Sequence, residues 1–153
     1  MRPDFRLRSR SAHVLVVVLS LAASSLSVRS MQSGLPRTIA KGDQSNIESA
    51  AQVLARTETE WIDLWRRHAG DRERPPVDYR REMVIGVFMG SRPNGGFSTT
   101  IIPSMEVKGV LVVRYSETMP PPGAVTAQVL TFPYHLVAIP KAAVTEVKFE
   151  QVQ

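Results

Sequence analysis

The spacing of apolar residues along this chain of 153 residues changes twice. A short, continuous apolar run stands near the start. Between about residues 46 and 69, apolar side chains recur every three or four positions, which predicts an amphipathic helix. After residue 80 the apolar residues gather in short, β-prone runs separated by turn residues, which predicts strands. A helix followed by strands indicates one α+β domain over residues 45–153, with an N-terminal helix packed on an antiparallel β-sheet or a small β-sandwich.

The predicted helix has a start signal and an end signal. Ser45 is a candidate N-cap, and Glu48 stands three residues later at the spacing of a capping box. Gly70 suits the position just after the last turn, and the basic residues before it favour the helix dipole. Trp61 and Trp65 are four positions apart and therefore share one helical face. We expect this face to bury both indoles against the sheet, and the alternative is a platform for a glycan or peptidoglycan.

The strand predictions cover short segments after the helix. A proline run, Pro120 to Pro122, interrupts them most strongly, and we expect it to be a stiff connector or an exposed contact. Residues 28–44 show little apolar periodicity and are rich in turn-forming residues, so they are predicted to form a flexible linker. The predicted strands span residues 82–89, 97–102, 109–116, 125–131, 135–139 and 143–151.

The first 27 residues are typical of a secretory signal peptide. Basic residues precede an apolar run from Val14 to Leu26, and Ser25 and Ser27 form a small-x-small cleavage signal. The run is shorter than the ~20 residues that a transmembrane helix needs. We therefore expect removal of residues 1–27, export to a bacterial envelope (periplasmic or extracellular), and no stable membrane span after cleavage.

Composition narrows the classes of chemistry that are open to the chain. There is no cysteine, which excludes disulfides, thiolate catalysis and cysteine metal ligands. The formal net charge of +5 depends heavily on the signal segment, where four arginines and one aspartate contribute a net +3 and leave about +2 for the rest. The high pI is therefore weak support for nucleic-acid binding, and no nucleic-acid partner is expected.

The histidines do not form a catalytic pattern. Three exist, and His13 lies in the signal segment. His68 ends the predicted helix, where its charge would favour the dipole, and His135 begins a predicted strand, where a half-buried structural role is expected. The sequence contains no Gly-x-Ser-x-Gly elbow, Ser-x-x-Lys nucleophile motif, His-Glu-x-x-His motif or phosphate loop. With two further histidines and no clustered carboxylates, we expect no enzyme activity, no metal site and no cofactor.

The most distinctive segment lies between the first two predicted strands. Pro93 fixes φ at roughly −65°, and the residues after it tolerate positive φ, which predicts a sharp, pre-shaped turn. The glycines either serve hairpin geometry alone or help to present a rigid loop to a protein partner. The predicted partner-binding residues are those of this loop, with two residues of a later turn as candidates if that turn lies nearby: Arg92, Pro93, Asn94, Gly95, Gly96, Phe97, Tyr134 and His135.

Three blocks of sequence resemble, in the same order, the PrcB C-terminal domain family. They run from Gly90 to Phe97, from Val112 to Gly123 and from Leu130 to Lys141, so that the resemblance covers about residues 80–150. Asn94 stands where threonine is expected and keeps a small polar turn residue. The family is named after a subunit of a bacterial surface protease complex, which associates with the protease without cutting peptide bonds. The resemblance thus implies an exported, non-enzymatic protein that binds or stabilises a protease, and it brings no catalytic residues.

The same loop also resembles, over residues 92–97, the Asn-Pro-Thr-Thr-Gly-Tyr loop of chagasin-type cysteine-protease inhibitors. Those inhibitors have an immunoglobulin-like β-fold and insert such loops into the protease cleft. Three functions therefore stay open. The chain is an accessory subunit of a protease complex, a protease inhibitor that uses the Gly-Gly loop, or a glycan- or peptidoglycan-binding module that uses the tryptophan face.

Overall fold

The computed structural model describes residues 35–102, 105–107 and 109–153. The predicted signal peptide, residues 1–27, lies outside these ranges, as does the first part of the predicted linker. In the part of the chain that is described, no helix is long and apolar enough to cross a membrane.

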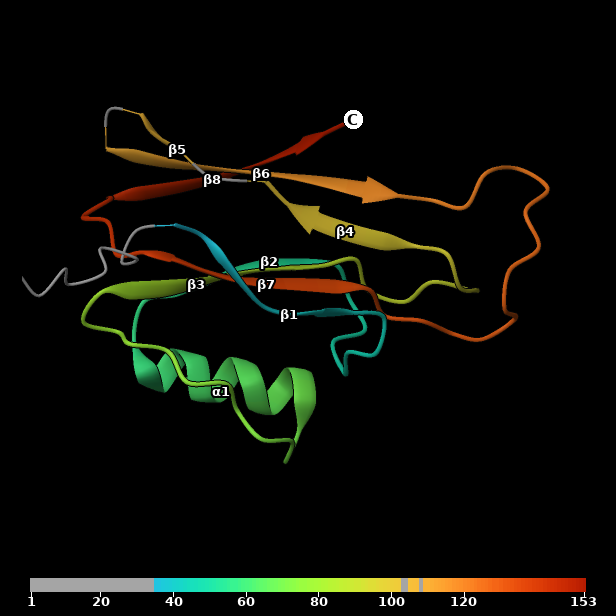
Figure 1. The fold of residues 1–153 in the computed structure, drawn as a ribbon, viewed down its shortest axis with the longest axis horizontal. Coiled ribbons are helices and arrows are strands. Elements are labelled where there is room, and N and C mark those ends of the chain that lie inside the picture. The colour runs from blue at the N-terminus through green and yellow to red at the C-terminus, as the bar shows by residue number, and fades with distance from the viewer. Residues whose placement is uncertain (1–34, 103–104, 108) are drawn as a thin grey trace, which may run out of the picture.

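The described chain folds in three layers: a helix, a middle sheet and an outer sheet (Figure 1). The helix is α1 (Glu58–Ala69). The middle sheet has the strand order β1-β7-β3-β2, and its pairs are antiparallel. Its strands, in that order, are β1 (Arg37–Gly42), β7 (Tyr134–Pro140), β3 (Glu82–Phe88) and β2 (Ala51–Ala55).

The outer sheet is built around one long strand, β6 (Val110–Thr118). Strands β4 and β5 pair antiparallel with successive parts of β6, whereas β8 pairs parallel with residues 110–116. Strand β8 pairs with residues of β6 that also pair with β4 or β5. It therefore lies on the opposite side of β6 from these two strands. The bounds of these three strands are β4 (Ser98–Ile101), β5 (Met105–Val107) and β8 (Glu146–Val152).

The expected α+β fold with an N-terminal helix was wrong. The described chain is mostly β-structure with one short internal helix, and β1 and β2 precede that helix. Strand β1 lies in the predicted linker, and β2 lies within the predicted helix 46–69. Residues 51–55 instead pair with β3, from Ala51 opposite Phe88 to Ala55 opposite Val84. These ladder hydrogen bonds and the packing of β2 outweigh the helical propensity of a segment rich in alanine.

Helix α1 begins at a later capping box than the predicted one. The Thr57 hydroxyl accepts a hydrogen bond from the Glu60 N–H, and the Glu60 carboxylate accepts one from the Thr57 N–H. Ser45 is buried and has another role, because its Oγ accepts from the Ile47 N–H and lies 2.9 Å from Nδ1 of His68. The predicted end of the helix at residue 69 is confirmed.

One predicted strand after the helix was also wrong. Residues 125–131 form loop, apart from an isolated bridge at Thr131, because no neighbouring strand pairs with them. The other predicted strands correspond to β3, β4, β6, β7 and β8. Among the strand pairs that the structure describes, only β6 and β8 are parallel, so the predicted antiparallel pairing is wrong for that pair alone.

Strands β3 and β7 are continuous apolar runs because both of their faces are buried. One face contributes Met83, Ile85 and Val137 to the core between the two sheets. The opposite face carries residues such as Val84 and Leu136, which pack against α1. This alternation explains why three layers are needed: each face of the middle sheet must be covered.

Candidate functional site

Two loops at one end of the two-sheet body form the candidate site (Figure 1). Residues 91–97 lie between β3 and β4, and residues 119–131 connect β6 to β7; we call them the paired loops. Arg92 and Thr131 exchange backbone hydrogen bonds of 2.8 and 2.9 Å, and the Gly95 N–H donates to the Ala127 carbonyl at 2.8 Å. The glycine loop and the proline-rich segment of the sequence therefore form one structure.

Side chains also tie the paired loops together. The hydroxyl of Thr131, which is itself buried, donates to the Asn94 carbonyl at 2.9 Å. In the first loop, the Arg92 guanidinium carbon lies 5.8 Å from the centre of the Phe97 ring, within the range of a cation–π contact. These interactions hold the first loop against the base of the second, which reduces the freedom of both backbones.

The two adjacent glycines of the first loop have different roles. Gly96 adopts a positive φ of 91°, as predicted, and a Cβ atom there would lie 3.1 Å from Cβ of Pro120. Gly95 does not have a positive φ, contrary to expectation. A Cβ atom at Gly95 would lie 3.5 Å from Cβ of Ala127, which is an ordinary contact. Gly96 is thus the residue that shapes the turn and lets the proline run approach.

The second loop presents large apolar side chains to solvent. The exposed fractions are 71% for Met119, 102% for Val125, 50% for Val129 and 54% for Leu130. The loop that carries them is hydrogen-bonded to the first loop at Ala127 and Thr131. Leu35, at 81%, is the other large apolar side chain that is exposed in the described residues. An apolar surface on a fixed loop is typical of a protein-binding site.

Tyr134 and His135, the two candidate contacts outside the glycine loop, are both buried. They are consecutive in β7, and successive side chains of a strand point to opposite faces. Tyr134 packs under α1, where its ring centre lies 4.2 Å from that of His68. The structure therefore does not bring Tyr134 and His135 onto a common surface with residues 92–97, although β7 begins beside the paired loops.

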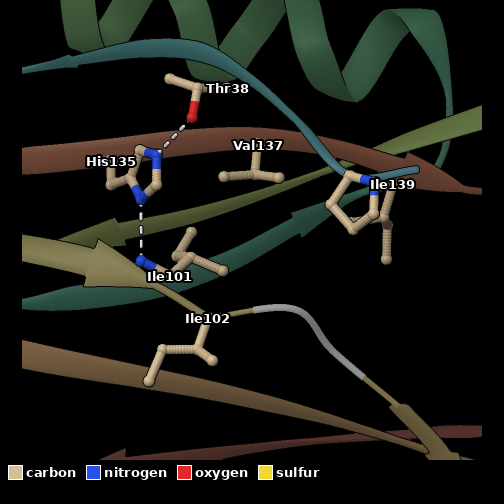
Figure 2. A pocket seen from close by; sticks show the side chains of 7 residues that line it. Thr38, Ile101, Ile102, His135, Val137 and Ile139 are labelled. Carbon is tan, nitrogen blue, oxygen red and sulfur yellow. Dashed lines mark hydrogen bonds between the residues drawn. The ribbon is translucent and has the colours of Figure 1, made fainter.

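His135 links three strands through its ring nitrogens (Figure 2). Its Nδ1 accepts the backbone N–H of Ile101 in β4 at 2.8 Å, and its Nε2 lies 2.9 Å from the hydroxyl of Thr38 in β1. Burial, with a smaller effect of the nearby Lys41 ammonium, lowers the pKa of His135 to about 4. The ring is therefore neutral at pH 7, with Nε2 carrying the proton and donating to Thr38. Both nitrogens are engaged, so His135 ties the sheets together and offers no free base.

A small cavity of about 120 Å³ lies beside His135 (Figure 2). Its walls are mainly apolar, and its two polar side chains, Thr38 and His135, bond to each other. A ligand site normally needs polar groups that remain available to orient the ligand. This cavity lacks them and is a weaker candidate than the paired loops. Its lining residues are Pro36, Thr38, Ile101, Ile102, His135, Val137 and Ile139.

The segment that contains the paired loops also carries the sequence similarity. Residues 83–140 match the family described as PrcB C-terminal. The expected resemblance is thereby confirmed over this range, which runs from β3 to the end of β7 and includes both loops. Comparison with curated proteins and with solved structures gave no match.

The matched segment, residues 83–140, is one part of a larger folded unit. Strands β1, β2 and β8 and helix α1 lie outside residues 83–140, yet they complete both sheets and cover the middle one. The paired loops lie entirely inside the segment. The matched residues therefore include the candidate site, and the surrounding elements supply the scaffold.

His68, on the scaffold helix, is fully buried, so the expected role of a charge at the helix end was wrong. Its ring lies 5.3 Å from Trp65, 5.6 Å from Phe88 and 4.2 Å from Tyr134, measured between ring centres. Burial, with a smaller effect of the charge of Arg72, lowers the pKa of His68 to about 4. The ring is neutral at pH 7 and serves as an aromatic core residue.

The tryptophans are core residues as well. Trp61 and Trp65 are buried, and their indole N–H groups donate to the carbonyls of Pro75 and Arg72 at 3.2 and 2.8 Å. The expected packing of this helical face is confirmed. The glycan alternative loses its support, because a sugar platform needs exposed rings.

The sequence did not reveal the exposure of Val125, Val129 and Leu130, because residues 125–131 were predicted to form a strand. The available signal was the proline run followed by Gly123, which together mark the start of a long irregular segment. A strand assignment predicts that valines are buried, whereas a loop leaves them exposed. Within the described ranges, no group of metal-ligating side chains comes together.

Proposed function

We propose that this chain is an exported, non-enzymatic accessory domain that binds a protease through the paired loops. The observation that carries the proposal is the exposure of Met119, Val125, Val129 and Leu130 on a loop whose backbone is hydrogen-bonded to the glycine loop. Each Å² of apolar surface removed from water contributes about 25 cal/mol to binding, before the costs of association. A partner with an apolar groove would gain most from this surface.

The fixed backbone strengthens the proposal. A loop that is already ordered loses less conformational entropy on binding than a free one. The bonds of Arg92 and Gly95 to the second loop, together with the close contact of Gly96 with Pro120, supply this order before a partner arrives.

The similarity to the PrcB C-terminal family supports the choice of a protease as the partner. The family implies association with a protease complex, and the matched range contains both loops. The buried positions of His68 and His135 support a role outside catalysis, since both rings are largely shielded from solvent and both pKa values are lowered to about 4.

The test is affinity capture from the native host's envelope with residues 28–153 as bait, followed by identification of the captured proteins. We expect a protease to be retained by the original sequence and lost with the double variant Val125→Asp/Leu130→Asp. Leu35→Asp is the matched control, because Leu35 is an exposed apolar residue that precedes β1 at the opposite end of β7 from the paired loops. Equal capture by all three baits would refute the proposal.

An activity assay on the captured protease separates the accessory role from inhibition. An accessory domain leaves peptide cleavage intact or prolongs the lifetime of the protease. Stoichiometric loss of cleavage, relieved by the loop variant, would assign the chain to inhibitors and overturn the accessory role.

A further inference from the structure

The first of the paired loops contains an asparagine that is followed directly by a glycine. In such a pair the glycine nitrogen can attack the side-chain amide carbon of the asparagine, because the attack closes a five-membered ring and glycine has no side chain to obstruct it. Asn94 and Gly95 form this pair. The chain has one other asparagine, Asn46, which precedes Ile47, and the branched side chain of isoleucine hinders the same attack. Asn94 is therefore the asparagine whose neighbour best permits the reaction.

The second loop holds both ends of the peptide group that joins these two residues. The N–H of this group, on Gly95, donates to the Ala127 carbonyl at 2.8 Å. Its carbonyl, on Asn94, accepts from the Thr131 hydroxyl at 2.9 Å. The glycine nitrogen must lose its proton and turn toward the asparagine side chain before it can attack, and both hydrogen bonds oppose this movement. The closed paired loops therefore protect Asn94.

The side chain of Asn94 lies where a neutral amide is tolerated better than a carboxylate. Its Oδ1 is buried and accepts no hydrogen bond within the part of the chain that the structure describes. An unpartnered oxygen is costly to bury, and a charged one costs far more. An aspartate at this position would therefore favour separated loops, in which its carboxylate reaches water.

We propose that Asn94 is a site of spontaneous deamidation that the paired loops control. While the loops are bonded the residue is protected, and it reacts when they separate by local opening. In the reaction, the Gly95 nitrogen forms a bond to Cγ of Asn94, and the bond from Cγ to Nδ2 breaks. Ammonia leaves and carries away the proton that the Gly95 nitrogen lost. Water then adds to either carbonyl of the resulting succinimide ring and opens it to aspartate or isoaspartate.

Both products weaken the contact between the loops. Aspartate places a charge at the buried Oδ1 position. Isoaspartate lengthens the backbone by one methylene group and turns the carbonyl that Thr131 bonds into a free carboxylate. The added methylene also displaces the Gly95 N–H relative to the Ala127 carbonyl. Deamidation is thus a one-way loss of the loop pairing, and its effect on partner binding, unlike the chemistry, rests on the proposed function.

Two threonine variants test whether the loop contact controls the reaction. Residues 28–153 are incubated at neutral pH, and peptide mass mapping follows the conversion of Asn94, with Asn46 as the internal reference. Thr131→Val removes the hydroxyl that bonds Asn94 and should speed deamidation about 5-fold, the factor for the loss of one typical hydrogen bond. Thr100→Val is the matched control, because its hydroxyl accepts a hydrogen bond outside the paired loops, and it should leave the rate unchanged. Equal rates in the two variants would overturn control by the loops.

Amide exchange in the original sequence tests the same point without a variant. The Gly95 N–H must leave the Ala127 carbonyl both to exchange with solvent and to free the nitrogen for attack. Low concentrations of urea should therefore speed Gly95 exchange and Asn94 deamidation by the same factor. A free peptide of residues 90–98 should deamidate at least about 10-fold faster than the folded chain, because opening the loops breaks two hydrogen bonds. Deamidation of the folded chain at the rate of the free peptide, or none while Gly95 exchanges, would overturn the proposal.

Substitutions of Asn94 separate the reaction from its effect on the loops. Asn94→Thr removes the amide and keeps a small polar residue, so it should abolish the mass change and keep the slow exchange of Gly95. Asn94→Asp reproduces one product and should speed Gly95 exchange at least about 5-fold relative to Asn94→Thr. Equal exchange in the two variants would overturn the one-way loss of pairing. The fresh chain should capture the protease and the deamidated chain should not. A fresh chain that captures none would refute the proposed function alone, because deamidation is measured by mass.

Discussion

At the scale of single residues, the two described histidines share one physical state. Both are buried, and burial lowers the pKa of each to about 4, whereas a histidine in an unfolded chain titrates near ~6.5. As the pH falls below 6.5, the unfolded chain binds protons that the folded chain excludes, so the free energy of unfolding decreases. We expect a loss on the order of 2 kcal/mol per histidine between pH 7 and pH 5, measured by urea unfolding.

The variant His135→Gln is the control for this pH dependence. Glutamine keeps an acceptor for the Ile101 N–H and a donor for Thr38, but it does not titrate. About half of the pH dependence should disappear. Glu82, whose pKa is lowered by its hydrogen bonds from Arg37, affects stability only at lower pH, below its ordinary value of 4.5. A free energy of unfolding that stays constant from pH 7 to pH 5 would contradict the neutral, buried state of both rings.

Glycines at superficially similar positions should also respond differently to substitution. Gly90 has a φ of 75°, and a Cβ atom there would lie 2.7 Å from the Glu48 carbonyl oxygen and the Ala50 nitrogen. Backbone atoms cannot easily move aside, so Gly90→Ala should lower the free energy of unfolding by more than about 2 kcal/mol. Gly95→Ala should change it by less than about 0.5 kcal/mol, because Gly95 has ordinary φ and room for a Cβ. Urea midpoints measure both effects.

A substitution at Gly123 is the control that measures the cost of a positive φ without steric overlap. It has a φ of 81°, but nothing lies within 4 Å of the position of a Cβ. Gly123→Ala should therefore cost only about 1 kcal/mol, the penalty of the left-handed conformation. If Gly90→Ala costs no more than Gly123→Ala, the close approach of the segment around Glu48 is not maintained in solution.

At the scale of elements, residues 46–57 show why the helix could be predicted only in part. The segment contains two signals of the capping-box type, at Ser45 with Glu48 and at Thr57 with Glu60, and both suit a helix start. Ala51, Val53 and Ala55 also alternate with their neighbours as in a strand. Over so few residues the two periods overlap, and the open edge of β3 decides between them.

The paired loops show a second limit on what the sequence can predict. The first was recognisable in the sequence by its adjacent glycines, whereas the prolines marked only the start of the second, because residues 125–131 were predicted to form a strand. Their contact, through Arg92 and Thr131, joins positions that are distant along the chain, and no local pattern encodes it. By contrast, the runs that became β3 and β7 were predicted because burial on both faces leaves a continuous apolar signature.

At the scale of the whole molecule, the matched segment should not fold alone. Residues 83–140 contain β3 and β7 but lack α1, which covers Val84, Phe88 and Leu136. They also lack β8, whose Val147 and Phe149 pack against the core between the sheets. We expect residues 83–140 to give a poorly dispersed NMR spectrum and to aggregate, since an uncovered apolar sheet face is unstable in water. Residues 35–153 should give a dispersed spectrum and one cooperative unfolding transition.

The same comparison tests whether the paired loops depend on the whole cooperative unit. Variants with α1 deleted should lose binding through the paired loops, which extend from β3 and β7. A well-dispersed spectrum for residues 83–140 would instead make that segment an independent domain. The scaffold argument would then be wrong, and protease capture by the loops should survive removal of every element that precedes β3.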